Sequence, residues 1–174
     1  DIRVLDLTQI YNGPYATFLM AMAGADVIKV EPPGGEHLRR RNARGGALYP
    51  FKMLNPNKRS ILLDLKSEED RDIFLELAST ADIIIENQAD GVMEKLGLGQ
   101  KKLRKANPNL TLISLTAFGS GNELSETRAY GSTLEHASGT PFFRGKPNWA
   151  PLMAHIAYGD RLGGIYGDAA LLLS

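Results

Sequence analysis

The sequence contains no cysteine, which excludes disulfides, thiolate metal sites and a cysteine nucleophile. It has no net charge, because 20 Lys and Arg balance 20 Asp and Glu, so no overall field attracts nucleic acid or anionic lipid. No apolar run approaches the roughly 20 residues that a membrane helix needs, and no signal peptide is visible. The three histidines lie far apart, without metal-ligand spacing. We therefore expect a cytoplasmic protein without metal, membrane or nucleic-acid partner.

The 174 residues are 43% hydrophobic and 23% charged, as in an ordinary globular domain. A chain of this length buries roughly 70% of the surface of its unfolded state, enough for one domain. It begins at Asp1 without Met in an apolar run and stops inside another, residues 169–173. We interpret it as an excerpt from a longer protein.

Short β-branched runs alternate with helical patterns, which predicts βαβ units and an α/β fold with a Rossmann-like parallel sheet. The expected strands are residues 3–8, 26–31, 60–65, 82–86 and 110–115. The expected helices are residues 15–23, 49–54, 68–79, 91–96, 101–105, 133–137 and 161–173.

Two helix starts carry local signals. Pro14 suits the first position of a helix, because proline lacks only an N–H that would have no partner there. Ser67 and Asp70 form a loose capping box before residues 68–79.

Three ligand motifs are incomplete. The turn at residues 11–16 has one glycine where a nicotinamide fingerprint needs three, although Glu31 sits where a ribose-binding acid is expected. Residues 139–146 resemble a phosphate loop, but the spacing is too long and Pro147 replaces the magnesium-binding Ser or Thr. Arginines at positions 39, 40, 41 and 44 form either a solvated loop or a phosphate clamp.

A set of motifs in order resembles the class III CoA-transferase family, which includes formyl-CoA and carnitine-type CoA-transferases and α-methylacyl-CoA racemases. The motifs are VLDLT (4–8), GP (13–14), GADVIKVEPPG (24–34), LNPNKRS (54–60), LDLK (63–66), DIIIEN (82–87), LGL (96–98), NP (107–108), SLTAFG (114–119), ASG (137–139) and GD (159–160). They extend over essentially the whole chain, so the resemblance is specific.

The resemblance implies that residues 1–174 are the amino-terminal part of the large CoA-binding domain, without the small domain and the return segment. It implies an enzyme that moves CoA between an acyl-CoA and a carboxylic acid. Coenzyme A or its acyl thioester is then a substrate, and no cofactor is bound permanently. It also implies an interlocked homodimer for the intact protein.

The resemblance places the nucleophile at Asp160. A carboxylate can attack a thioester and form covalent intermediates, and no metal or general base is required. We expect Gly159, Gly163 and Gly164 to leave room for the thioester. The alternative role for Asp160 is an N-cap for residues 161–173.

Contacts to CoA are also implied by the resemblance. Tyr11 and Asn12 correspond to the loop at the pantetheine and thiol end, and residues 63–66 to a strand end facing adenosine and phosphates. Lys95 corresponds to a phosphate contact. The full set is Tyr11, Asn12, Leu63, Asp64, Leu65, Lys66, Asn87, Gln88, Ala89, Lys95, Arg128, Ala129, Tyr130 and Gly131.

Two departures from the family bear on the reaction. Gly131 stands where formyl-CoA transferases carry a glutamate, which argues against a formyl and oxalate pair. Tyr130 stands where racemases carry a histidine, and racemisation needs a base on each face of the α-carbon. Transfer is therefore favoured over the alternatives, a racemase or epimerase and a non-catalytic CoA-binding module. Phe142, Phe143 and Trp149 either line an opening for the acyl chain or belong to the core.

Overall fold

The computed structural model describes residues 2–40, 49–154 and 158–172. Its strands are β1 (Arg3–Asp6), β2 (Asp26–Glu31), β3 (Arg59–Leu62), β4 (Ile83–Glu86) and β5 (Thr111–Ser114). Its helices are α1 (Asn12–Met22), α2 (His37–Arg40), α3 (Tyr49–Leu54), α4 (Glu68–Ser79), α5 (Val92–Lys95), α6 (Gln100–Ala106), α7 (Gly131–Ala137), the 3-10 helix η1 (Thr140–Phe143) and α8 (Tyr158–Leu172).

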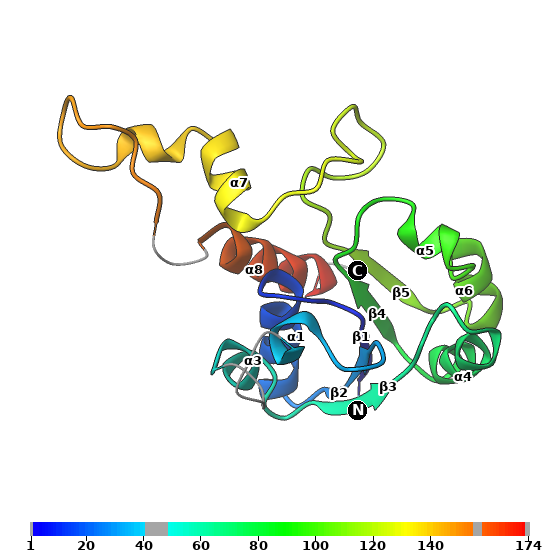
Figure 1. Cartoon of the computed structure of the whole chain (residues 1–174). Helices are drawn as coiled ribbons and strands as arrows, with labels where there is room; N and C mark the ends of the chain where they lie inside the picture. The colour runs from blue at the N-terminus through cyan, green and yellow to red at the C-terminus, as the bar shows by residue number, and fades with distance from the viewer. Residues whose placement is uncertain (1, 41–48, 155–157, 173–174) are drawn as a thin grey trace.

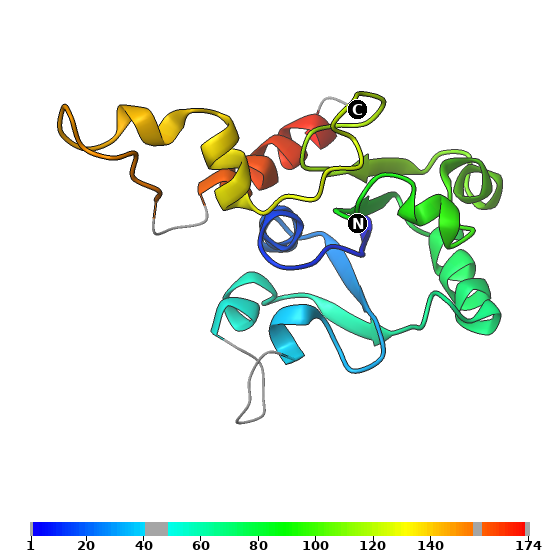
Figure 2. The same ribbon diagram turned by 45° about the horizontal axis from the view of Figure 1, so that its top comes forward.

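The five strands form one parallel sheet in the order β3-β2-β1-β4-β5. The order reverses between β1 and β4, as in doubly wound α/β domains, so the predicted Rossmann-like fold is confirmed. Figures 1 and 2 show α4 and α6 on one face of the sheet and α1 and α8 on the other.

Apolar side chains fill both layers because successive strand residues point to opposite faces. On the α1 side, Val4, Val27 and Ile85 of the strands pack with Ala16 and Met20. On the α4 side lies a larger cluster, which includes Leu5, Leu7, Ile28, Val30, Phe74, Ile84, Leu98 and Leu103. The central strands β1 and β4 are thus covered on both faces, which explains their nearly continuous apolar runs.

Helix α4 has the predicted bounds, but the predicted capping box is wrong. Ser67 makes no side-chain cap hydrogen bond, and the Asp70 carboxylate instead accepts from the Asp64 backbone N–H at 2.6 Å. The first turn contains three acidic residues, Glu68, Glu69 and Asp70. Their negative charges interact favourably with the positive end of the helix dipole. Pro14 is the third residue of α1 rather than the first, still inside the turn whose N–H groups have no helical partner.

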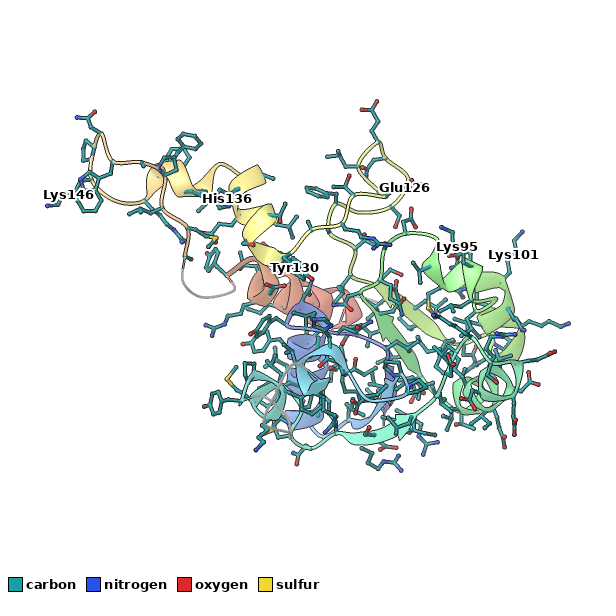
Figure 3. The ribbon with its side chains drawn as sticks, in the orientation of Figure 1. Lys95, Lys101, Glu126, Tyr130, His136 and Lys146 are labelled. Carbon is teal, nitrogen blue, oxygen red and sulfur yellow. The ribbon has the colours of Figure 1, made fainter. Side chains whose placement is uncertain are left out.

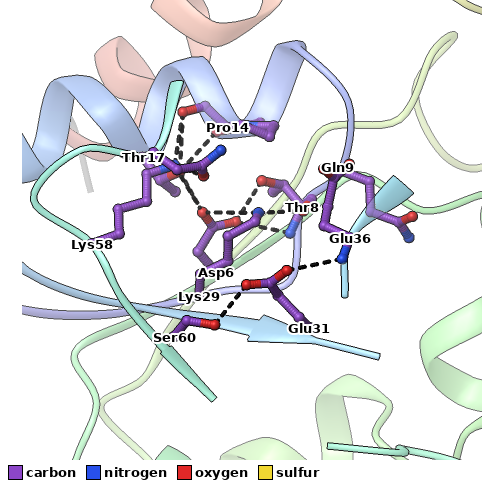
Figure 4. Close-up of polar contacts among 12 residues, drawn as sticks. Asp6, Thr8, Gln9, Pro14, Thr17, Lys29, Glu31, Glu36, Lys58 and Ser60 are labelled. Carbon is purple, nitrogen blue, oxygen red and sulfur yellow. Dashed lines mark hydrogen bonds and ion pairs between the residues drawn. The ribbon is translucent and has the colours of Figure 1, made fainter. Parts of the chain in front are cut away.

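A buried polar cluster lies under the start of α1 (Figure 4). Asp6 is fully buried and lies 3.6 Å from Lys29 Nζ and 3.1 Å from Lys58 Nζ. Thr17 donates a hydrogen bond of 2.6 Å to the same carboxylate. The two ammonium groups and the hydroxyl bonds outweigh burial and lower the pKa of Asp6 to about 2, whereas burial lowers the pKa of Lys58 to about 8.

Beyond β5 the chain leaves the sheet. Helix α7 and the segment after it project away from the domain (Figures 1 and 2). Phe142, Phe143 and Trp149 on this projection are 77%, 90% and 58% exposed, so they do not belong to the core. None of the described helices is long and apolar enough to cross a membrane.

We expect Asp6→Asn to lower the free energy of unfolding of the intact protein by about 3–5 kcal/mol, because it leaves two buried ammonium groups without their anion. Urea unfolding at neutral pH measures this change. Acid has the same effect on the unmodified protein. Since the folded-state pKa is about 2 and the ordinary value is 3.8, the stabilisation is complete above pH 3.8 and is lost as the pH falls toward 2.

Asp26→Asn is the matched control, because Asp26 pairs with Arg3 and Arg59 at the surface. Exposed pairs contribute about 0–1 kcal/mol, so this variant should unfold almost like the unmodified protein. Equal losses in the two variants would contradict the role given to the buried cluster.

Candidate functional site

A cavity of about 620 Å³ opens at the carboxyl edge of the sheet, next to the reversal of strand order. Its wall is formed by the turns after β1, β4 and β5 and by the first residues of α7 and α8. Parallel α/β sheets bind ligands at this position. The lining residues are Gln9, Ile10, Asn12, His37, Asn87, Gln88, Ala89, Val92, Leu115, Thr116, Ala117, Ser125, Thr127, Arg128, Ala129, Tyr130, Gly131, Thr133, Leu134 and Asp160.

Asp160 is the one acidic residue among the described residues that line this cavity. It lies in the first turn of α8, which begins at Tyr158, so the expected N-cap role is wrong. Burial raises the pKa of Asp160, and a hydrogen bond from the Gly131 backbone opposes part of this effect. No cation appears among the causes of this shift, unlike at Asp6.

Two glycines allow α7 and α8 to meet at Asp160. A Cβ at Gly131 would lie 2.2 Å from Asp160 Oδ2, and one at Gly159 would lie 3.0 Å from the Gly131 carbonyl oxygen. A side chain at position 131 therefore requires the carboxylate or the start of α7 to move. A glutamate at this position, which the resemblance implies for formyl-CoA transferases, would require the same movement.

Gly163 and Gly164 do not provide space for a thioester, contrary to expectation. A Cβ at Gly163 would lie 2.8 Å from the Asn12 side chain, and one at Gly164 would lie 2.9 Å from the Asn12 carbonyl oxygen. These glycines instead let α8 pack closely against α1, which brings the start of α8 to the turn after β1. Asn12 Oδ1 is buried without a hydrogen-bond partner in the described part of the chain.

A second cavity of about 270 Å³ lies beside the first and shares Gln9, Gln88 and Val92 with it. Residues 63–66 line this cavity at the end of β3, together with residues of β2 and the turn after β1. We call the two adjacent cavities together the groove, and Lys66, which lines the second cavity, is exposed.

The groove thus brings together most of the residues that the sequence singled out. Tyr11 precedes α1 but does not line either cavity, and neither does Lys95, which is exposed on α5. Figure 3 shows Tyr130 at the base of α7, whereas Lys95 lies on the distant α5. The guanidinium of Arg39 is bonded to Glu31 at 2.9 Å and lies over the Phe51 ring. Positions 41 and 44 and the Arg40 side chain lie outside the described residues.

Sequence reasoning missed several cavity residues. Gln9 and Ile10 follow β1, and Thr116 and Ala117 follow β5, so the rule that strand ends bind ligands could have found all four. His37 was expected to be an ordinary polar residue, and it lines the cavity on α2. Nothing local to His37 indicates that α2 folds back onto the turn after β1.

Glu31, which sits where a nicotinamide site would have its ribose-binding acid, is not available for this role. Both oxygens of Glu31 accept hydrogen bonds, from Arg39, from Ser60 Oγ at 2.6 Å and from the Glu36 backbone at 2.9 Å. Glu31 is 1% exposed and therefore does not present a carboxylate to a ribose. Within residues 2–40, 49–154 and 158–172 there is no cluster of three or more His, Asp or Glu side chains that could hold a metal ion.

The fold and the site define a doubly wound α/β domain with two adjacent cavities at the carboxyl edge of its sheet. The sequence model of CoA-transferase family III matches residues 1–174, and the chain belongs to this family. The resemblance that the motifs indicated is confirmed.

Characterised relatives agree with this assignment. The chain is 46% identical over 128 residues to a succinyl-CoA:mesaconate CoA-transferase of Haloarcula hispanica, a match that covers 68% of this chain and 32% of the relative. It is 38% identical over 169 residues to an acetyl-CoA:oxalate CoA-transferase of Acetobacter aceti, covering 95% and 43%.

A crystal structure of a CAIB/BAIF family protein from Brucella suis has a TM-score of 0.94 and 31% identity, covering 99% of this chain and 47% of that one. The chain thus spans less than half of the length of each of these proteins.

We expect Gly131→Ala to slow any reaction that needs Asp160 by about a hundredfold, because displacing a reacting group by about 1 Å has an effect of this size. The rate of covalent modification at Asp160 in the intact protein measures it. Gly99→Ala is the control, since its Cβ would meet only side-chain atoms of the exposed Glu94, at 3.1 Å. Equal rates in both variants would show that the glycine is not needed.

Proposed function

We propose that the intact protein is a CoA-transferase that moves CoA between an acyl-CoA thioester and a carboxylic acid, with Asp160 as the covalent nucleophile. One observation carries the proposal: a single acidic residue, Asp160, lies in the cavity at the carboxyl edge of the sheet. The names of the relatives support the reaction class, since each is a CoA-transferase acting with a dicarboxylic acid.

The reaction balances without a metal, a redox partner or an added proton. An Asp160 oxygen attacks the thioester carbonyl, the C–S bond breaks, and the CoA thiolate leaves a mixed anhydride on the enzyme. The thiolate then attacks the aspartyl carbonyl and releases the first acid as a carboxylate. The acceptor carboxylate attacks the carbonyl of the resulting aspartyl thioester, the C–S bond breaks, and the CoA thiolate leaves a second mixed anhydride. The thiolate then attacks the acyl carbonyl of this anhydride and gives the new acyl-CoA and free Asp160.

The groove supports CoA as the ligand. Its second cavity, at residues 63–66, offers Lys66 for a phosphate, and the first cavity places Asn12, Asn87 and residues 128–131 near the nucleophile. CoA is a long molecule with its thiol at one end, which fits a groove that runs from Lys66 to Asp160. The buried, unpartnered Asn12 Oδ1 is suited to accept a hydrogen bond from a pantetheine amide. Lys95 and Tyr11 belong to the proposed contacts through the resemblance alone.

We further propose a cytoplasmic homodimer for the intact protein. The exposed aromatic side chains of the projection after α7, such as Phe142 and Phe143, support a surface that is covered in the assembled protein.

We expect the intact protein to form a donor-dependent adduct on Asp160 when it is incubated with a panel of acyl-CoAs. Hydroxylamine or borohydride quenching, followed by digestion and mass spectrometry, locates the modified residue. Asp160→Asn should lower adduct formation and CoA exchange by about a thousandfold or more, because an amide is not a nucleophile. Asp168→Asn on the same helix is the control, since Asp168 does not line the groove.

The alternatives give different results in the same experiment. His37 lines the cavity with Asp160, so the cavity contains a second side chain of a type that can act as a base. Entry of solvent deuterium at the α-carbon without an adduct would overturn the transferase proposal and favour a racemase. CoA binding without an adduct, deuterium entry or CoA exchange would favour a non-catalytic binding module.

Adduct formation should lose rate as the pH falls through the raised pKa of Asp160. The carboxylate is the nucleophile and the acid is inactive, so the midpoint is expected above the ordinary value of 3.8. Single-turnover rates at saturating acyl-CoA, measured across the acidic range, give this midpoint. A rate that is constant down to pH 3.8 would contradict Asp160, with its raised pKa, as the nucleophile.

A further inference from the structure

The turn between β1 and α1 contains one strained residue. Ile10 has a φ of 69°, in the left-handed region that β-branched residues rarely adopt. The other described non-glycine residues with positive φ are Asn57 and Asn148, and asparagine tolerates this conformation. Strain of this kind persists only where the surroundings fix it, and it concentrates at functional sites.

Two side chains from other segments hold this turn. The Ile10 N–H donates to Glu36 Oε1 at 2.8 Å. Asn87 accepts from the Gln9 N–H and donates to the Gln9 carbonyl oxygen, both at 2.8 Å. Gln9 and Ile10 are therefore both held by side chains from other segments. Both residues line the cavity that contains Asp160.

Glu36 is placed for this task by a chain of hydrogen bonds, of which Figure 4 shows those that link Glu36, Glu31 and Ser60. It is 1% exposed, and its second oxygen accepts from the Leu38 N–H at 2.9 Å. Its own N–H donates to Glu31 Oε2 at 2.9 Å, and Glu31 is held in turn by Arg39 and Ser60. The carboxylate therefore cannot turn away from Ile10 without breaking both of its hydrogen bonds. A hydrogen bond to a charged acceptor is also stronger than one to a neutral group.

We propose that Glu36 is a positioning residue: it holds Ile10 in the left-handed conformation and so fixes the cavity wall that receives acyl-CoA beside Asp160. The identity of the ligand rests on the proposed function, whereas the hold on the turn does not.

The test compares Glu36→Gln with Glu135→Gln in the intact protein. Glutamine keeps the shape but replaces one acceptor oxygen by a donor, so the Ile10 or Leu38 N–H loses its partner. Glu135 is the matched control, a carboxylate that is 5% exposed and accepts from Arg144 at 2.7 Å and from the Ala154 N–H at 2.9 Å, away from the turn.

In Glu36→Gln we expect amide hydrogen exchange in residues 9–12 to accelerate about tenfold without ligand, and the Kd for CoA by calorimetry to rise about tenfold. Glu135→Gln should change neither quantity more than about twofold. Unchanged exchange in Glu36→Gln, or faster exchange with an unchanged Kd, would overturn the proposal.

Ile10→Gly separates positioning from general support of the fold. Glycine adopts a φ of 69° without strain, so the effect of Glu36→Gln on the Kd should shrink by at least about threefold in this background. An equal effect in both backgrounds would show that Glu36 does not act through Ile10.

Failure of the proposed function is recognised separately, in the unmodified protein. If that protein binds no CoA, or binds it and forms no adduct on Asp160, the proposed function fails. If the unmodified protein binds CoA and Glu36→Gln leaves the Kd unchanged, the inference about Glu36 fails.

Discussion

The geometry of the carboxyl edge depends on a carboxylate, Asp6, that is buried between two ammonium groups. Lys29 comes from β2 and Lys58 from the segment before β3, so the cluster ties β1 to its neighbours on one side of the sheet. Asp6 also accepts from the backbone and the hydroxyl of Thr8, which sets the direction in which the chain leaves β1. The turn that follows is therefore fixed at its first residue by electrostatics in a water-free site.

The contact between α1 and α8 transmits this geometry to Asp160. Gly13 starts α1 against Thr8, where a Cβ would lie 2.2 Å from the threonine side chain. Gly163 and Gly164 then bring α8 against the first turns of α1. Asp160 sits one turn before these glycines, so its position over the groove follows from helix packing rather than from a loop. Sites on packed helices hold their groups more closely than sites on free loops.

Features that depend on the local sequence were predicted correctly, whereas features that depend on other partners were not. The strands and α4 were predictable because their apolar periodicity reflects burial on the sheet. The groove was predictable in outline because ligand contacts follow strand ends. The capping box failed because Asp70 finds a better donor at Asp64, and a motif says nothing about competing partners. The buried Lys29 was not predictable, since its anion Asp6 lies on another strand.

The strain at Ile10 shows the same limit at the site. Positive φ is predicted from glycine or asparagine, and isoleucine gives no such signal. The conformation exists because Glu36 and Asn87, 26 and 78 residues away from their partners in the turn, supply the hydrogen bonds. Gly163 and Gly164 were likewise interpreted from the reaction, whereas their neighbours on α1 determine their role. A sequence pattern identifies residues whose chemistry suits a reaction. It does not identify which residues from distant segments pack against them.

Two aspartates in one domain, Asp6 fully buried and Asp160 half-buried, show how the surroundings assign their roles. Asp6 has two ammonium partners, a pKa of about 2 and no access to the groove. Asp160 has one opposing hydrogen bond, from the Gly131 backbone, and its pKa is raised. Basicity and nucleophilicity rise together within one class of nucleophile. The Asp6 carboxylate, whose pKa is lowered by two cations, is therefore suited to a structural role. The Asp160 carboxylate, whose pKa is raised, is better suited to the proposed attack on a carbonyl. A cation paired with Asp160 would stabilise its charge and lower its basicity, and no cation contributes to the pKa of Asp160, although Arg128 lines the same cavity.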